Sequence, residues 1–252
     1  MTTNELPNRY EYWNPRNWSY QFLAEAKRLW EMETSSSRVR MTTIQAAILL
    51  NLISLTNAAD AIGFMYTEKA IEMARRARLF GAQVTKQNTR RNNSKGFTAW
   101  ALYNWQWQVP NTEQNGTIYW RLYPADLSCP STLSLAHFKP PLLTTPPALA
   151  LPDPSTDPNW YGQTWLRYPM DPMLYTTQFP HLFKAHSGFS ALVIKGWAIG
   201  AQTGESRDDL EMSAEWRALV HSQYGAMKKW YSNLPEPLRA DRIALPSHLM
   251  LQ

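Results

Sequence analysis

Histidine and cysteine are the residue types that could support metal binding or nucleophilic catalysis, and the chain contains few of them. His181 and His186 are the only closely spaced histidines, and their i, i+5 spacing puts them about 140° apart on a helix. No third ligand accompanies them, so we expect packing or surface roles for both. Cys129 is the single cysteine, which excludes an internal disulfide, and no neighbouring base would activate its thiol.

Motifs that carry common enzyme chemistry are absent from the sequence. There is no Gly-x-Ser-x-Gly elbow, no phosphate-binding Walker loop and no dinucleotide fingerprint, and only 10 glycines are spread along 252 residues. We therefore expect no catalytic residue, no metal site and no cofactor in this chain, and we do not expect an enzyme.

Tryptophan is abundant and could line a pocket for a small molecule or a partner. Such pockets are mostly apolar with a few polar groups, and the alternative is ordinary core packing, which we favour. The candidate residues are Trp100, Trp105, Trp107, Trp160 and Trp165.

A cluster of basic residues could contact a phosphate backbone. Its members, in a polar stretch over residues 82–96, are Lys86, Arg90, Arg91 and Lys95. No stacking platform or groove-reading helix accompanies them, so we favour a solvated loop. The net charge of +5 decides little, because basic and acidic residues are mixed along the predicted helices.

The elements that would position these residues are predicted to be helices. Apolar residues make up 44% of the chain and aromatic residues 13%, too many for a disordered protein. Helical periodicity predicts helices over about 20–32, 43–55, 62–80, 97–108, 180–198 and 206–234. The only strand signal is a weak alternation at 117–123, so the predicted fold class is all-α, a helical bundle or array.

Several details of these helices are predicted from the sequence. Thr42 and Gln45 match a capping box, and Gly81 is expected to end the helix that begins near Ile62. For the helix at 43–55 the expected core stripe is Ile44, Ile48, Leu52 and Leu55. The absence of charge from Met41 to Ala59 approaches the length of a membrane span, but its polar residues favour a buried core helix.

Prolines separate the two helical halves of the sequence. Seven of them fall between Lys139 and Pro158, which forbids a regular helix there. We expect this segment, residues 139–158, to form a long Pro-rich crossover over the surface.

The order of the sequence blocks resembles one family. The stretch Met-Thr-Thr-Ile-Gln-Ala-Ala-Ile-Leu-Leu at 41–50 is followed by residues 63–66 and then by Lys-Ala-Ile-Glu-Met-Ala-Arg-Arg-Ala-Arg-Leu-Phe at 69–80. Further blocks lie at 96–106, 140–141, 151–152, 160–162, 165–169 and 230–235. Together they resemble the fungal-specific transcription factor domain, the middle homology region of zinc binuclear cluster factors, in the branch with nitrogen-assimilation and xylanolytic activators.

The resemblance implies a regulatory domain over residues 20–250, preceded by an N-terminal extension at 1–19. It implies modulation of transcription by RNA polymerase II in the nucleus, with co-regulators or a small-molecule inducer as partners and a possible homodimer. DNA would be bound indirectly, through a six-cysteine zinc cluster that one cysteine cannot form, so we expect a chain truncated at both ends. The alternatives are a small-molecule-binding helical domain and a non-functional gene fragment, and no membrane association is expected.

Overall fold

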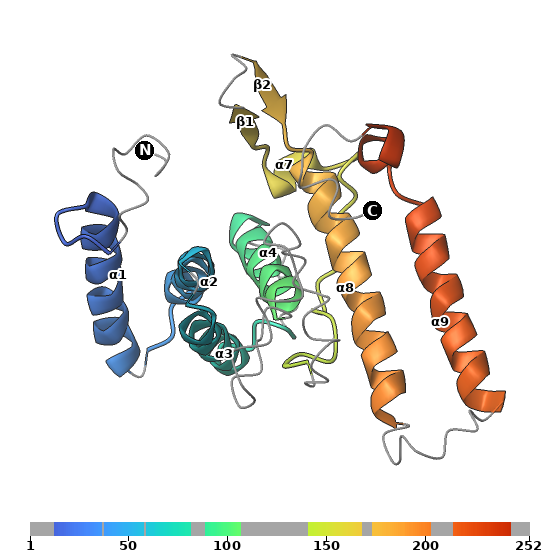
Figure 1. Ribbon diagram of the computed structural model, residues 1–252, viewed down its shortest axis with the longest axis horizontal. Coiled ribbons are helices and arrows are strands. Elements are labelled where there is room, and N and C mark those ends of the chain that lie inside the picture. The colour runs from blue at the N-terminus through green and yellow to red at the C-terminus, as the bar shows by residue number, and fades with distance from the viewer. Residues whose placement is uncertain are drawn as a thin grey trace. The chain divides into compact units, whose positions relative to one another are not determined.

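The computed structural model describes residues 13–36, 38–57, 59–81, 89–106, 141–167, 173–202 and 214–242. Most of these residues are helical, which confirms the all-α prediction (Figure 1). The chain divides into two compact units, Met1–Arg78 and Leu79–Gln252. The predicted extension at 1–19 is described only from Trp13 onward.

The first unit contains three helices: α1 (Trp18–Ser35), α2 (Met41–Thr56) and α3 (Asp60–Arg76). Asn17 caps α1 by accepting a hydrogen bond from the Ser19 backbone N–H at 2.8 Å. The backbone N–H of Ala59 donates to the Ser54 carbonyl at 2.8 Å and closes a short connection between α2 and α3. These two helices therefore form an αα-hairpin that carries most of the buried residues of this unit.

The buried face of α2 differs from the predicted stripe. Ile44 is buried as expected, but Leu52 is 42% exposed, and the stripe prediction was wrong there. The buried positions instead include Ala47, Leu50, Asn51 and Ser54. Because α2 is apolar nearly all round, hydropathy does not determine which face turns inward, and polar contacts with α3 decide it.

The predicted ends of these helices also need correction. The N-cap of α2 is Arg40 and makes no side-chain cap hydrogen bond, so Thr42 lies inside the helix and the capping-box prediction was wrong. α3 ends at Arg76, in whose last turn Arg75 and Arg76 suit the helix dipole. The left-handed residue that follows is Arg78, with φ of 52°, rather than the predicted Gly81.

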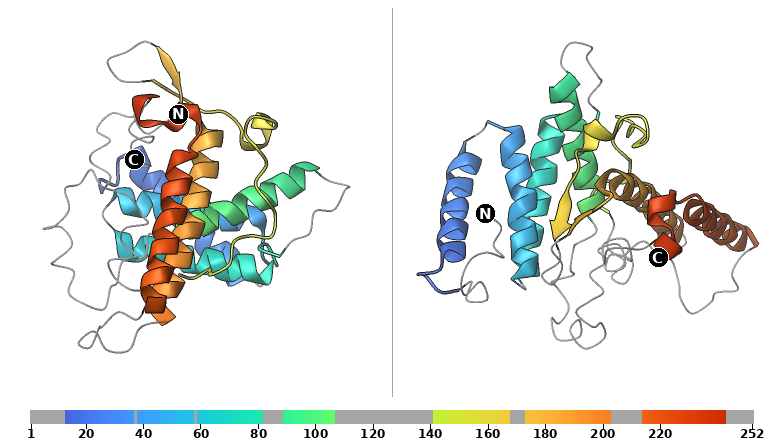
Figure 2. Two further views of the ribbon diagram at one scale, coloured as in Figure 1. Left: turned by 90° about the vertical axis from the view of Figure 1, so that its right-hand side faces the viewer. Right: turned by 90° about the horizontal axis from the view of Figure 1, so that it is seen from above.

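The second unit contains the helices α4 (Thr89–Trp105), α7 (Pro158–Tyr161), α8 (Phe179–Gln202) and α9 (Ala214–Ser232), with two 3-10 turns at Glu236–Leu238 and Ala240–Arg242. α8 and α9 lie side by side and run in opposite directions (Figure 2). The predicted helix start at Ser206, the predicted loop residue Lys86 and the weak strand signal at 117–123 fall outside the described residues. The helix after 206 ends as expected, before Pro235 and Pro237.

α4 begins earlier than predicted, so residues 89–96 are helical and the prediction of a loop over the whole of 82–96 was wrong. Asparagine, serine and glycine there have low helix propensity, which favoured a loop from sequence. Burial against other elements overrides this preference: Asn92 is buried, and a methyl group at Gly96 would lie 2.0 Å from Leu149 Cδ2.

A two-stranded antiparallel sheet was missed by the sequence prediction. Strand β1 (Trp165–Arg167) pairs with β2 (Leu174–Thr176), with Leu166 opposite Tyr175. Each strand has three residues, too few for an alternation to be recognised. A backbone hydrogen bond from Thr177 N–H to the Thr164 carbonyl, at 3.1 Å, closes the base of this hairpin.

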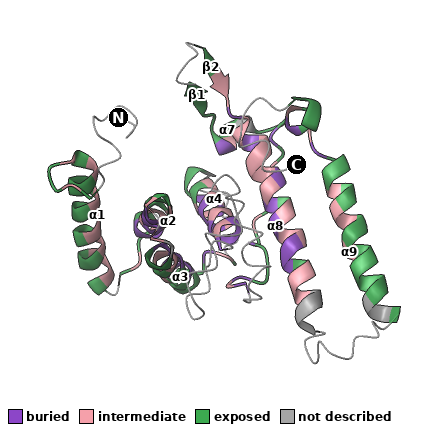
Figure 3. Cartoon of the chain, viewed as in Figure 1, coloured by how far each residue is buried: buried purple, intermediate pink, exposed green. Residues whose placement is uncertain are grey.

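The Pro-rich segment is irregular over its described part, residues 141–157, as predicted. It is not wholly superficial, because Pro141, Leu143, Pro147 and Pro154 are buried. By contrast with these buried positions, the described residues of α9 are mostly exposed (Figure 3).

Candidate ligand or partner site

Aromatic side chains from α4, α7 and α8 form one cluster around Phe97. The Phe97 ring stacks on Phe183 with centroids 4.8 Å apart and packs at 6.0 Å against both Trp160 and Phe179. Tyr161 joins through Trp160, at 4.6 Å. The cluster therefore connects three elements that are far apart in the sequence.

Trp100 lies on the same helix as Phe97 and holds the Pro-rich segment. Its Nε1–H donates to the Leu149 carbonyl at 2.7 Å, and its ring meets Tyr103 edge-on at 5.5 Å. Leu149 also approaches Gly96, and Trp160 lies 3.4 Å from the position of a methyl group at that glycine. Leu149 is therefore close to α4, which carries Trp100, and to α7, which carries Trp160.

The five predicted tryptophans do not form a single described group. Trp160 packs against Phe97 and belongs to the cluster, Trp100 contacts Tyr103 and the Leu149 carbonyl, and Trp165 is 55% exposed on β1. Trp105 is half-buried at the last position of α4, and Trp107 lies outside the described residues. Among the described members, the rings of Trp100 and Trp160 therefore have packing partners within the protein.

Sequence reasoning did not assign Phe97, Phe179 and Phe183 to this cluster. A signal existed, because Phe179 and Phe183 are one helical turn apart and share a face. Phe97 could not be connected to them, because it lies 82 and 86 positions before them in the sequence, and the path of the chain between is not revealed by the sequence.

Two tyrosines in this region are held in the neutral form. The Tyr161 hydroxyl donates to the Pro152 carbonyl at 2.7 Å, and burial, with Asp153 and Asp157 nearby, raises its pKa. Burial raises the pKa of Tyr103 to about 12. Neither phenol can act as a base near neutral pH.

Polar side chains connect α4 to the rest of the unit. Asn104 Nδ2 donates to Ser187 Oγ on α8 at 2.7 Å, and Ser187 Oγ donates to the Phe183 carbonyl at 2.8 Å. Gln106 Nε2 donates to the Leu143 carbonyl at 3.1 Å, and its Oε1 accepts from the Leu143 N–H at 2.6 Å. Each of these contacts has a structural role, since it satisfies buried polar groups.

The two histidines on α8 have different neighbours. His186 Nδ1 lies 3.5 Å from Ser190 Oγ, and burial lowers its pKa. Burial also lowers the pKa of His181, against the opposing effect of Asp153. In the part of the chain that the structure describes, no group of three or more His, Cys, Asp and Glu residues is placed to hold a metal ion.

The described basic residues of the predicted loop lie on the first turns of α4. Arg90 and Arg91 are exposed and Lys95 is half-buried. A further charged pair joins Lys184 on α8 to Asp153 at 3.3 Å, and both partners are exposed. This exposed pair contributes little to stability.

No family model, curated protein or solved structure matches this chain.

No helix within the described ranges is long and apolar enough to span a membrane. The uncharged stretch from Met41 accordingly forms α2, whose buried face packs on α3. The site is an aromatic cluster whose polar neighbours are hydrogen-bonded within the protein.

Proposed function

We propose that this chain is the regulatory, middle homology domain of a fungal zinc-cluster transcription factor. In this role it modulates transcription by RNA polymerase II in the nucleus and contacts co-regulators or a small-molecule inducer. DNA is read by a zinc-cluster region outside this chain, because a six-cysteine cluster cannot be built from one cysteine.

The observation that supports the proposal is the burial of the resembling blocks. In the block at 41–50, Ile44, Ala47 and Leu50 are at most 4% exposed. In the block at 69–80, Ala70, Ile71, Met73 and Ala74 are also at most 4% exposed. The motif positions therefore build the α2–α3 hairpin, as expected of a pattern that specifies a helical fold rather than a catalytic site.

Later blocks have a similar structural role in the second unit. Gly96, which has no side chain, leaves room for Leu149, and Trp160 packs on Phe97. Leu234 is 5% exposed, and Trp230 packs against it. The blocks thus account for packing in both units, and they leave the recognition of partners to the surface.

A transcriptional reporter tests the proposal. The whole chain is placed between a heterologous DNA-binding domain and a constitutive activation domain in a fungal host. We expect reporter expression to change several-fold relative to an unrelated helical domain of equal length.

Two variants make the comparison specific. Ile71→Asp places a charge at a position only 2% exposed and should abolish the effect, whereas Glu68→Lys, on the exposed surface of the same helix, should retain it. An unchanged reporter with the wild-type chain, or the same effect with Ile71→Asp, would contradict the proposed role.

A further inference from the structure

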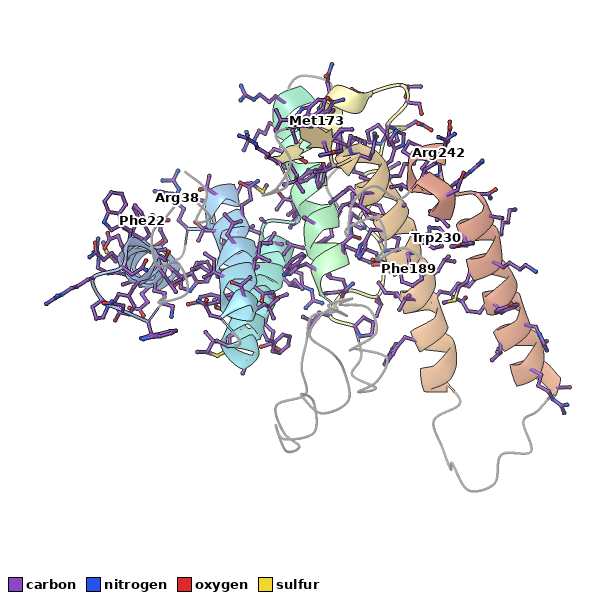
Figure 4. The ribbon with its side chains drawn as sticks, turned by 45° about the horizontal axis from the view of Figure 1, so that its top comes forward. Phe22, Arg38, Met173, Phe189, Trp230 and Arg242 are labelled. Atoms are coloured by element: carbon purple, nitrogen blue, oxygen red, sulfur yellow. The ribbon has the colours of Figure 1, made fainter. Side chains whose placement is uncertain are left out.

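Helix α1 carries an apolar stripe on a face that no described residue covers. Trp18 is 55% exposed, Phe22 68%, Leu29 47% and Met32 58%, and α1 contains no buried residue. Phe22 is labelled on α1 in Figure 4. With Glu25 between Phe22 and Leu29, the stripe follows steps of 4, 3, 4 and 3 residues, the spacing of a coiled-coil seam.

A second face of α1, about 100° around the helix from the stripe, already has its own contact. Trp30 meets Tyr66 of α3 edge-on, with ring centroids 5.5 Å apart. A half-buried row that includes Leu23, Ala26 and Trp30 lies on this inner side. The helix is therefore apolar on two faces, and the packing of the first unit uses only one of them.

The stripe is interrupted by a paired charge rather than by a free one. Arg28 donates to both carboxylate oxygens of Glu25, through Nε at 2.8 Å and Nη2 at 2.7 Å. Arg28 Nη1 also lies 2.9 Å from Met32 Sδ, which holds the guanidinium along the stripe. Each copy of the helix thus presents one acid and one base at the middle of its seam, and two copies together remain neutral.

The exposed area is comparable with that of a small protein interface. Four large side chains that are each about half exposed leave roughly 100 Å² apiece, so two copies could remove about 800 Å² from water. Flanking residues bring the total to about 1,000 Å², the low end for a specific complex. Trp18 and Phe22 already contact each other edge-on at 6.4 Å, which reduces the ordering needed on association.

We propose that two copies of this chain associate through the stripe formed by Trp18, Phe22, Glu25, Leu29 and Met32 on α1. A second copy fits better than an anionic lipid surface or an acidic peptide, because Glu25, the charged residue of the stripe, is already neutralised by the adjacent Arg28. A repeat of 4 and 3 residues also fits the seam of a second helix of the same kind. The inference concerns assembly and does not depend on the proposed transcriptional role.

Sedimentation velocity of the full chain tests this inference over roughly 1–100 µM, the range in which a small interface assembles. We expect a monomer–dimer equilibrium for the wild-type chain. Phe22→Glu should raise the dimer dissociation constant at least about tenfold, because it places an unpaired charge in the seam. Circular dichroism should show unchanged helix content, since Phe22 is exposed.

Tyr224→Glu is the matched control, because Tyr224 on α9 is 65% exposed, close to the 68% of Phe22. It should dimerise as the wild-type chain does. A wild-type chain that stays monomeric throughout this range would overturn the proposal. A dimer that survives Phe22→Glu, or one that Tyr224→Glu weakens equally, would place the interface elsewhere and would also overturn it.

Discussion

At the scale of single residues, one polar pair explains why the core of the α2–α3 hairpin differs from its hydropathy pattern. Asn51 Nδ2 donates to Thr67 Oγ1 at 2.6 Å, and both residues are at most 2% exposed. Leaving either group unpaired in the interior would cost about 1–3 kcal/mol. That penalty is sufficient to turn Asn51 inward and to leave Leu52 outward on a helix that is apolar almost all round.

Gly63 permits the close approach of these two helices. A methyl group there would lie 2.5 Å from Asn51 Oδ1 and 3.1 Å from Ser54 Cβ. We expect Gly63→Ala to lower the free energy of unfolding by about 1–3 kcal/mol, measured by urea denaturation.

Gly225→Ala is the control for the same change in a helix. Around Gly225 on α9, no described atom lies within 4 Å of the added methyl group. Stability should rise by about 0.5–1 kcal/mol, since alanine favours the helix. If Gly63→Ala proves equally stabilising, the close approach of α2 and α3 does not exist as described.

His186 makes stability depend on pH in a predictable direction. Burial lowers its pKa below 6.5, so the folded state favours the neutral ring and protonation favours unfolding. The free energy of unfolding should therefore fall as the pH drops from about 7.5 to about 5. The lowered pKa values of Asp153 and Glu72 act at more acidic pH, below this window.

His186→Gln should flatten this dependence without abolishing it, because the pKa of His181 is lowered as well. Denaturation midpoints at several pH values provide the measurement. An unchanged slope in His186→Gln would remove His186 as the cause.

At the scale of elements, the existence of the helices was largely predictable and their ends were not. Helical periodicity located α2, α3, α8 and α9, because runs of many residues average out local exceptions. The start of α4 could not be predicted from the sequence, because its first turns are polar. Their helical structure depends on the burial of Asn92 and on contacts at Gly96. The pairing of β1 with β2 was hidden for another reason, because two strands of three residues carry almost no pattern.

The candidate site was predicted only in part, for a related reason. Trp160 was identified from composition, but its neighbour Phe97 lies on α4, and Phe183, on which Phe97 stacks, lies on α8. Contacts of that kind depend on how α4, α7 and α8 meet, which one sequence does not reveal.

Trp230 joins α9 to α8 and provides a test at this scale. Its Nε1–H donates to the Ala185 carbonyl at 3.1 Å, and its ring packs on Phe189 at 5.0 Å (Figure 4). We expect Trp230→Ala to destabilise the second unit by about 3 kcal/mol or more, measured by thermal or urea unfolding.

The neighbouring Tyr231 is the matched control, since it is 45% exposed. Tyr231→Ala should change the free energy of unfolding by no more than about 0.5 kcal/mol. Equal losses in the two variants would show that α9 is not held to α8 through Trp230.

At the scale of the whole molecule, the chain consists of two units with separate cores. The first depends on the α2–α3 hairpin, and the second on the aromatic cluster around Phe97 together with the contacts of Trp230. Separate cores allow the units to open with different free energies.

Hydrogen exchange followed by mass spectrometry tests this independence. Gly63→Ala should accelerate exchange in α2 and α3 and leave α8 unchanged, whereas Trp230→Ala should accelerate exchange in α8 and α9 and leave α2 unchanged. Parallel acceleration across both units by either variant would instead indicate a single cooperative structure.

The hydrogen bonds that hold the backbone of the Pro-rich segment have a consequence for aggregation. An extended apolar stretch with open backbone groups can pair with the same stretch of another chain. Here Gln106 occupies both the N–H and the carbonyl of Leu143, Trp100 occupies the carbonyl of Leu149, and Ala148 N–H donates to the Phe80 carbonyl. Prolines at 141, 146 and 147 offer no donor, so fewer backbone groups of this segment remain as a template for fibril growth.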